Sequence, residues 1–200
     1  MSKLIVTEFM SLNGVIEAPG GEPTHPHTGW TVDFTFPEPG QQAKASGAEE
    51  QMKYKLDEVL EAESLLLGRK TYEGFSAAWP ELDGEFADKM NSMPKYVVSS
   101  TLTDPEWHNT TVLSGDVIDE IRKLKAHDGG PILVAGSATL VHALVENDLV
   151  DQYRVMVFPV LIADGLRMFP DVTEKKLLQL VDTQTFGSGV AVHTFEPAGS

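Results

Sequence analysis

Two short segments of this sequence have the composition of a phosphate-binding turn. Gly68-Arg69-Lys70-Thr71 follows an apolar run at 65–67, and Gly136-Ser137-Ala138-Thr139 follows another at 132–135. A strand that ends in glycine and leads into a helix leaves backbone N–H groups free, and the dipole of that helix favours an anion. Two such turns in one domain would suit the phosphate groups of a dinucleotide.

The side chains of the two turns differ. Arg69, Lys70 and Thr71 add two cations and a hydroxyl to the first, in a chain with only 15 basic residues, which favours an anion there. The alternative is that Gly68 only permits a turn and that both cations are solvated. The second turn has small residues that allow close approach to the backbone, but it lacks the three-glycine fingerprint of dinucleotide sites.

The composition excludes several classes of function. The formal net charge is −15, so the electrostatic field repels nucleic acids and anionic membranes, and we expect neither as a partner. The absence of cysteine removes disulfides, thiolate metal sites and cysteine nucleophiles. His25 and His27 have no partner cluster at ligand spacing, so no metal is expected. Without a signal core or a membrane span, the sequence predicts a soluble, cytoplasmic protein.

Hydrophobic patterning predicts the elements that position the turns. Strands are expected at 4–9, 64–67, 95–100, 110–114, 132–134 and 151–160, and a closing hairpin at 177–186 and 190–195. Helices are expected from Arg69, at 116–127, at 138–146 and at 45–62, where Met52, Leu56, Val59 and Leu60 would form the inward face. This alternation predicts one α/β domain over residues 1–200, with a mostly parallel central sheet, helices on both faces and an antiparallel C-terminal hairpin.

The long segment at 19–43 is rich in proline and glycine and is interpreted as a binding loop or lid. It contains Trp30, which would either close over an apolar substrate or fasten the loop to the core. Trp79 and Trp107 are expected to be packing residues. In open α/β sheets ligands bind at the carboxyl ends of the strands, where both glycine turns are expected.

Several segments, taken in order, resemble a known family. LLLGRKTYEGF at 65–75, KYVVSS at 95–100 and ILVAGSATLVHAL at 132–144 follow an opening VTEFMSLNGVIE, and PVLIADGLRMF occupies 159–169. Together they are similar to the dihydrofolate reductase superfamily. The branch they resemble is that of the C-terminal reductase domain of the bifunctional riboflavin-biosynthesis deaminase/reductase.

This resemblance implies a dihydrofolate-reductase-like sheet of about eight strands and an NADPH-dependent oxidoreductase. It implies hydride transfer to a C=N or C=O carbon of a small heterocycle such as 5-amino-6-(5-phosphoribosylamino)uracil, and a possible homodimer. By resemblance, the adenosine 2′-phosphate meets the strand-end residues after KYVV, and the other phosphates meet the two turns. The implied cofactor-binding residues are Gly68, Arg69, Lys70, Thr71, Ser99, Ser100, Thr101, Gly136, Ser137, Ala138 and Thr139.

The substrate side departs from the family pattern. Dihydrofolate reductases carry a carboxylate in the helix before the first turn, whereas this chain has Met52 near that place, which speaks against folate reduction. Relatives often show Ser-Leu-Asp-Gly where this chain has Asn13, so a proton-donating carboxylate is lost there and the sequence identifies no catalytic acid. The catalytic candidates are Asn13, which would orient the substrate, and Trp30 of the long segment. The substrate candidates are these two residues with Arg167. The alternatives are dihydrofolate reductase activity, reduction of another imine or carbonyl, and an NADPH-binding regulatory module without turnover.

Overall fold

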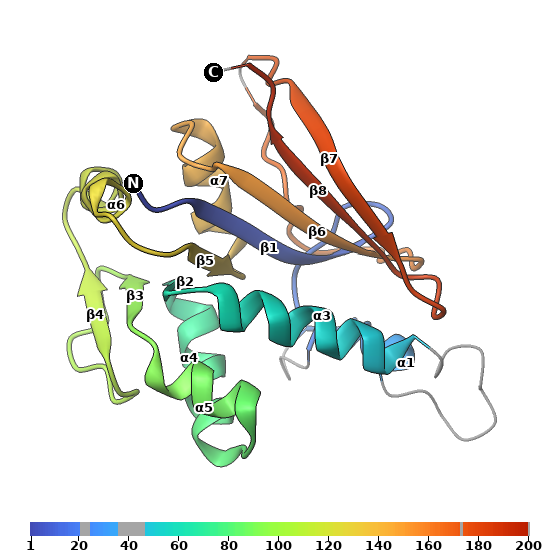
Figure 1. Cartoon of the computed structure of the whole chain (residues 1–200), viewed down its shortest axis with the longest axis horizontal. Helices are drawn as coiled ribbons and strands as arrows, with labels where there is room; N and C mark the ends of the chain where they lie inside the picture. Colours follow the sequence, from blue (N-terminus) through green and yellow to red (C-terminus); the bar gives the residue numbers. More distant parts are fainter. Residues whose placement is uncertain (21–24, 36–46, 173, 200) are drawn as a thin grey trace.

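The structure, a computed structural model, describes residues 1–20, 25–35, 47–172 and 174–199 (Figure 1). The strands are β1 (Leu4–Ser11), β2 (Ser64–Gly68), β3 (Lys95–Val98), β4 (Thr110–Leu113), β5 (Ile132–Ala135), β6 (Gln152–Phe158), β7 (Leu178–Thr185) and β8 (Ala191–Pro197). The helices are α1 (Val32–Thr35), α3 (Ala48–Glu61), α4 (Arg69–Ala78), the 3-10 turn η1 (Trp79–Glu81), α5 (Glu85–Ser92), α6 (Val117–Ala126) and α7 (Ala138–Glu146).

All eight strands form one sheet in the order β4-β3-β2-β5-β1-β6-β8-β7. The first six strands in this order run parallel to one another, whereas β8 is antiparallel to both β6 and β7. The predicted parallel sheet with an antiparallel C-terminal hairpin is therefore confirmed. The carboxyl ends of β2, β3, β4 and β5 meet at one edge of the sheet, because parallel neighbours end on the same side.

Helices cover both faces of the parallel part, with α3, α4 and α5 on one side and α6 and α7 on the other (Figure 1). Leu65 and Leu67 of β2 pack with Val59 and Met90 on the first side, and Leu66 packs with the α6 and α7 residues on the second. A strand buried on both faces needs a continuous apolar run, which explains the sequence Leu65 to Leu67. None of the helices in the described ranges is long and apolar enough to cross a bilayer.

The inward face of α3 differs from the prediction. Met52 is 42% and Leu60 is 38% exposed, whereas Gln51, Glu58 and Val59 are buried. The reason is a polar contact with the sheet, where the Thr7 hydroxyl of β1 donates to Glu58 Oε2 at 2.9 Å. A polar side chain can be buried when it is hydrogen-bonded in this way. The predicted helix residues 45–46 lie outside the described residues.

Trp30 is a packing residue of a third apolar cluster. Its ring packs edge to face against the ring of Phe158 at a centroid distance of 5.5 Å, and the ring of Phe34 packs against Phe158 at 5.6 Å. The Trp30 indole N–H donates to the backbone oxygen of Glu17 at 2.9 Å. Of the predicted 19–43 loop, residues 25–35 are therefore attached to the core at this ring, while much of the remainder lies outside the described residues.

Lys95 is a fully buried lysine at the start of β3. Its ammonium donates to the backbone oxygens of Asn91 at 3.0 Å, Met93 at 2.7 Å and His108 at 3.0 Å, and it lies 4.4 Å from the centre of the Trp107 ring. Burial lowers the pKa of this ammonium to about 8. The three N–H groups of the ammonium each donate to one backbone carbonyl, so the Lys95 side chain links the end of α5 and the loop before β4 to β3.

Replacing Lys95 with methionine is expected to destabilise the fold by about 2 kcal/mol, because three buried carbonyls lose their donor while one desolvated charge is removed. Urea denaturation at pH 7 measures the change. Lys123→Met, at a lysine side chain 62% exposed on α6, is the matched control and should stay within about 0.5 kcal/mol of the parent. Equal midpoints for the two variants would contradict the role given to Lys95.

Candidate functional site

The two predicted glycine turns touch each other at the carboxyl edge of the sheet. A β-carbon built on Gly68 would lie 2.1 Å from Ser137 Oγ and 2.4 Å from Ser137 Cβ. One built on Gly136 would lie 2.8 Å from both Oγ1 and Cγ2 of Thr71. Each turn therefore fills the space that a side chain on the other would need, and only glycine permits this approach.

The second turn has an unusual backbone. Gly136 has φ +80° and Ser137 has φ +75°, so two consecutive residues lie in the left-handed region that disfavours side chains. Residues held in such conformations are over-determined by their surroundings and are often found at ligand-binding sites. This turn places the first residues of α7 beside the first residues of α4.

Both helices that begin at the turns lack the usual caps. Neither Gly68 before α4 nor Ser137 before α7 makes a side-chain cap hydrogen bond, and neither first turn contains an acidic residue. Among the described helical segments, every other one has an acidic residue in its first turn. In a chain of net charge −15, the first turns of these two helices thus contribute no acidic side chain of their own, which suits an anion.

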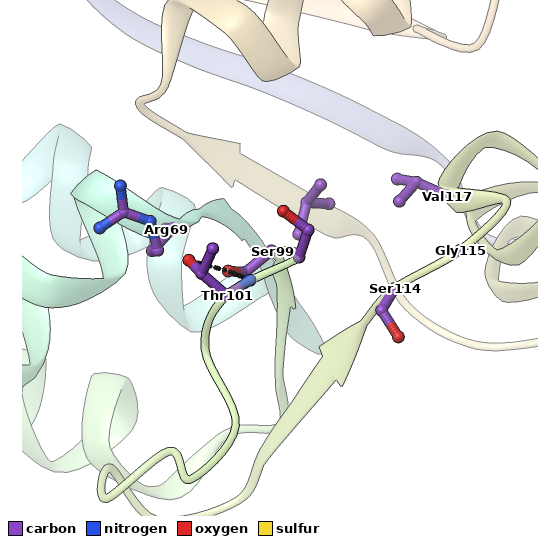
Figure 2. A pocket seen from close by; sticks show the side chains of 8 residues that line it. Arg69, Ser99, Thr101, Ser114, Gly115 and Val117 are labelled. Atoms are coloured by element: carbon purple, nitrogen blue, oxygen red, sulfur yellow. Dashed lines mark hydrogen bonds between the residues drawn. The ribbon is translucent and has the colours of Figure 1, made fainter.

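A cavity of about 420 Å³ opens beside the first turn, at the ends of β3 and β4. Figure 2 shows Arg69 on one side, Ser114, Gly115 and Val117 on the other, and the Ser99–Thr101 turn between them. The lining residues are Arg69, Val98, Ser99, Ser100, Thr101, Ser114, Gly115 and Val117. The structure therefore brings together Arg69 with the three strand-end residues that the resemblance had assigned to the 2′-phosphate.

Some polar groups of this cavity already form hydrogen bonds within the protein. Ser99 Oγ accepts hydrogen bonds from the backbone N–H of Thr101 at 3.1 Å and of Leu102 at 2.9 Å (Figure 2). Ser99 therefore shapes the turn that presents Ser100 and Thr101, which are exposed. The Arg69 guanidinium bonds Glu73 Oε1 at 2.6 Å within α4, and a partly exposed pair of this kind is weak.

Glu8 is a site residue that the sequence reasoning missed. It lies in β1, is 5% exposed, and its Oε1 accepts the Gly136 N–H at 2.9 Å. Burial is the main cause that raises the pKa of this carboxyl to about 8, against the lowering effect of the Gly136 hydrogen bond and of Lys55. The signal was present in the sequence, since Glu8 is an acid inside a run otherwise suited to a buried strand.

The substrate candidates make contacts within the chain. The Asn13 side chain donates to the Ile162 oxygen at 2.8 Å and accepts the Ile162 N–H at 3.1 Å. Arg167 Nη1 donates to the Asn13 oxygen at 2.6 Å, and its side chain is exposed. These bonds fasten the segment after β6 to the end of β1, and the substrate roles of Asn13, Trp30 and Arg167 stay predictions. No group of three or more histidine or acidic side chains able to hold a metal occurs in the described ranges.

The residues present fit a dinucleotide. Gly68 and Gly136 let the two turns pack directly against each other, so the two helix starts, which lack side-chain caps, lie side by side and supply N–H donors. The adjoining cavity has one cation and several hydroxyl groups at its rim, which are the groups that recognise a phosphate monoester. The remaining turn residues, Lys70, Ala138 and Thr139, lie in the first turns of the same two helices.

Comparison with known proteins identifies the family and the fold. The family model described as the RibD C-terminal domain matches residues 2–192. The uncharacterized protein YyaP of Bacillus subtilis (strain 168) is 26% identical over 193 residues, which cover 94% of this chain and 91% of that protein. The uncharacterized protein YwjB of the same organism is 28% identical over 131 residues, with coverages of 66% and 72%.

Two solved structures share the fold. A putative riboflavin biosynthesis protein from Shewanella sp. PV-4 aligns with a TM-score of 0.73 and 19% identity, over 98% of this chain and 99% of that one. Dihydrofolate reductase from Enterococcus faecalis, complexed with NADP(H) and RAB-propyl, aligns with a TM-score of 0.62 and 15% identity, over 98% and 97%. The fold is therefore dihydrofolate-reductase-like, and because the family model spans nearly the whole chain, this protein belongs to the RibD C-terminal domain family.

Proposed function

We propose that this protein is an NADPH-dependent reductase that acts on a C=N or C=O group of a small heterocyclic substrate. The observation that carries the proposal is that two helix starts, which lack side-chain caps and have no acidic residue in their first turns, meet across Gly68 and Gly136 beside a cavity that Arg69 lines. The family membership supports a substrate of the riboflavin-precursor type.

In this proposal the protein binds the dinucleotide and orients it toward the substrate. The backbone N–H groups at the starts of α4 and α7 hold the pyrophosphate, while Arg69, Ser100 and Thr101 hold the 2′-phosphate in the cavity. When bound, the nicotinamide supplies the hydride. The chain contributes the alignment of the cofactor with the substrate and the exclusion of water, which together favour the reacting geometry.

The proposal is tested by titrating the protein with NADPH and NADH while tryptophan fluorescence is followed, with calorimetry as confirmation. We expect saturable binding with a preference for NADPH. Candidate pyrimidine and pterin heterocycles are then added, and the loss of NADPH absorbance reports turnover. Binding without consumption of NADPH would favour the regulatory module, and absence of binding to either cofactor would reject the proposal.

Arg69→Ala is expected to weaken NADPH binding by about 1.5–3 kcal/mol, because a charged hydrogen bond to the 2′-phosphate is lost. NADH lacks this group, so its affinity should change by less than about twofold. Lys53→Ala is the control, since Lys53 likewise forms an exposed i,i+4 ion pair, with Asp57 on α3. If Arg69→Ala weakened both cofactors equally, the 2′-phosphate would not lie in this cavity.

A further inference from the structure

Glu8 combines burial with a hydrogen bond that leaves part of its carboxyl unused. The Gly136 N–H is the one hydrogen-bond partner of this carboxyl within the part of the chain that the structure describes, and it engages Oε1 alone. Gly136 begins the left-handed turn that leads into α7. The carboxyl therefore touches the backbone of the turn to which the proposed function assigns the pyrophosphate.

The charged groups that act on Glu8 come from α3, which packs against the neighbouring residue Thr7. Lys55 and Glu58 of α3 both act on the Glu8 carboxyl. Lys55 is already engaged, since its ammonium bonds Glu58 Oε2 and the Thr7 hydroxyl. Arg154 of β6 lies 3.6 Å from Glu58 Oε1 and bonds Glu61 at 3.0 Å. The two cations thus face Glu58, and no ion pair to Glu8 is formed within the described residues.

A carboxyl in this setting keeps its proton at neutral pH, because burial disfavours the charged form and no cation is paired with it. A neutral carboxyl has one acceptor oxygen and one O–H donor. The acceptor can serve the Gly136 N–H, so the O–H is left for another acceptor. An anion bound at the turn would supply one, whereas an ionised Glu8 would repel that anion.

We propose that Glu8 is a positioning residue of the dinucleotide site: as a neutral acid it holds the 136–137 turn through the Gly136 N–H and donates its O–H to an oxygen of the bound dinucleotide. This inference rests on the proposed function, because the ligand is the same cofactor. It adds that the affinity depends on the protonation of one buried side chain in the strand beside the turn.

The sign of the pH dependence follows from linkage. The bound phosphates make ionisation of Glu8 harder, so the pKa of Glu8 is higher in the complex than in the free protein. Below pH 8 the free protein already carries the proton and the affinity is constant. Above it, binding requires uptake of a proton, and the Kd rises by up to about tenfold per pH unit. The 2′-phosphate of NADPH titrates near pH ~6, outside this range.

The test measures the Kd of NADPH and of NADH from pH 6.5 to 9.5 by calorimetry, in two buffers of different ionisation enthalpy so that proton uptake is counted. We expect the parent protein to take up a proton with either cofactor above pH 8 and to lose about tenfold in affinity per unit. Glu8→Gln keeps an acceptor for Gly136 and cannot ionise, so its Kd should change by less than about threefold over that range. Glu63→Gln is the matched control, because Glu63 also accepts a glycine N–H, from Gly130, but is exposed; it should behave like the parent.

The outcomes separate the two proposals. Binding without proton uptake by the parent, or equal pH dependence in the parent and Glu8→Gln, overturns the role of Glu8 and leaves the reductase proposal standing. Absence of binding of both cofactors at every pH overturns the proposed function and this inference with it. If Glu8→Gln does not fold, as circular dichroism would show, Glu8→Met, which cannot ionise either, takes its place and is expected to lose the proton uptake that the parent shows with NADH, a cofactor without a 2′-phosphate.

Discussion

Glu8→Gln is expected to remove a pH-dependent loss of stability that amounts to about 5 kcal/mol in the parent protein between pH 4.5 and pH 8. The folded protein holds the Glu8 proton up to about pH 8, whereas the unfolded chain releases it near pH 4.5. Between these values the folded state binds more protons, so the contribution is complete below pH 4.5 and is lost as the pH rises through 8. Glutamine retains the acceptor for Gly136 and has no proton to lose.

The measurement is the free energy of unfolding in urea at pH 5, 6, 7 and 8 for the parent, Glu8→Gln and Glu63→Gln. Other groups titrate in this range as well, so the informative quantity is the difference between each variant and the parent. We expect the difference for Glu8→Gln to grow steadily in favour of the variant with rising pH, and the difference for Glu63→Gln to stay constant. A constant difference for both variants would show that Glu8 titrates like an ordinary surface carboxyl.

Gly68→Ala is expected to destabilise the fold by about 3 kcal/mol and to weaken dinucleotide binding more than tenfold. The added carbon would lie 2.4 Å from Ser137 Cβ, so the two turns must move apart. This contact involves a carbon attached to the backbone as well as the movable hydroxyl, and rotation of the Ser137 side chain cannot relieve it. Separation of the turns also displaces the N–H groups that are proposed to share one ligand.

A double-mutant cycle isolates this contact. Ser137→Gly removes both atoms that Gly68→Ala would meet and suits the left-handed backbone at φ +75°, so the double variant should recover most of the lost stability. Thermal unfolding and NADPH titration are followed for both single variants and the double variant. Additive destabilisation would mean that the turns are not in contact, whatever their individual roles.

The glycine turns were predictable because their signal is local. Leu65 to Leu67 and Ile132 to Ala135 identify buried strands, and glycine before helix-forming residues identifies the end of each. Parallel pairing then brings the two ends to one edge without further information. The contact of Gly68 with Ser137 needed the strand order, which places β2 directly beside β5.

The α3 face and Glu8 were not predictable by the same rule. Apolar periodicity selects Met52 and Leu60 as inward residues, whereas the helix turns Lys55 and Glu58 toward Thr7. Polar residues become core residues when partners from distant parts of the chain satisfy them, and one sequence does not reveal those partners. The sequence does not distinguish a substrate role from a core role for Trp30, whereas the structure shows its contact with Phe158 in the core.

The clamp between Asn13 and Ile162 has a consequence for the chemical ageing of the protein. Asn-Gly is the sequence most prone to deamidation, in which the following backbone nitrogen attacks the side-chain amide. Here both ends of the Asn13 amide are hydrogen-bonded to the backbone of one residue, Ile162, and the Gly14 N–H donates to the Ser11 oxygen at 2.9 Å. The nucleophile and its target are thereby kept apart in the folded protein, so the appearance of aspartate or isoaspartate at Asn13 records how often the end of β1 separates from the segment after β6.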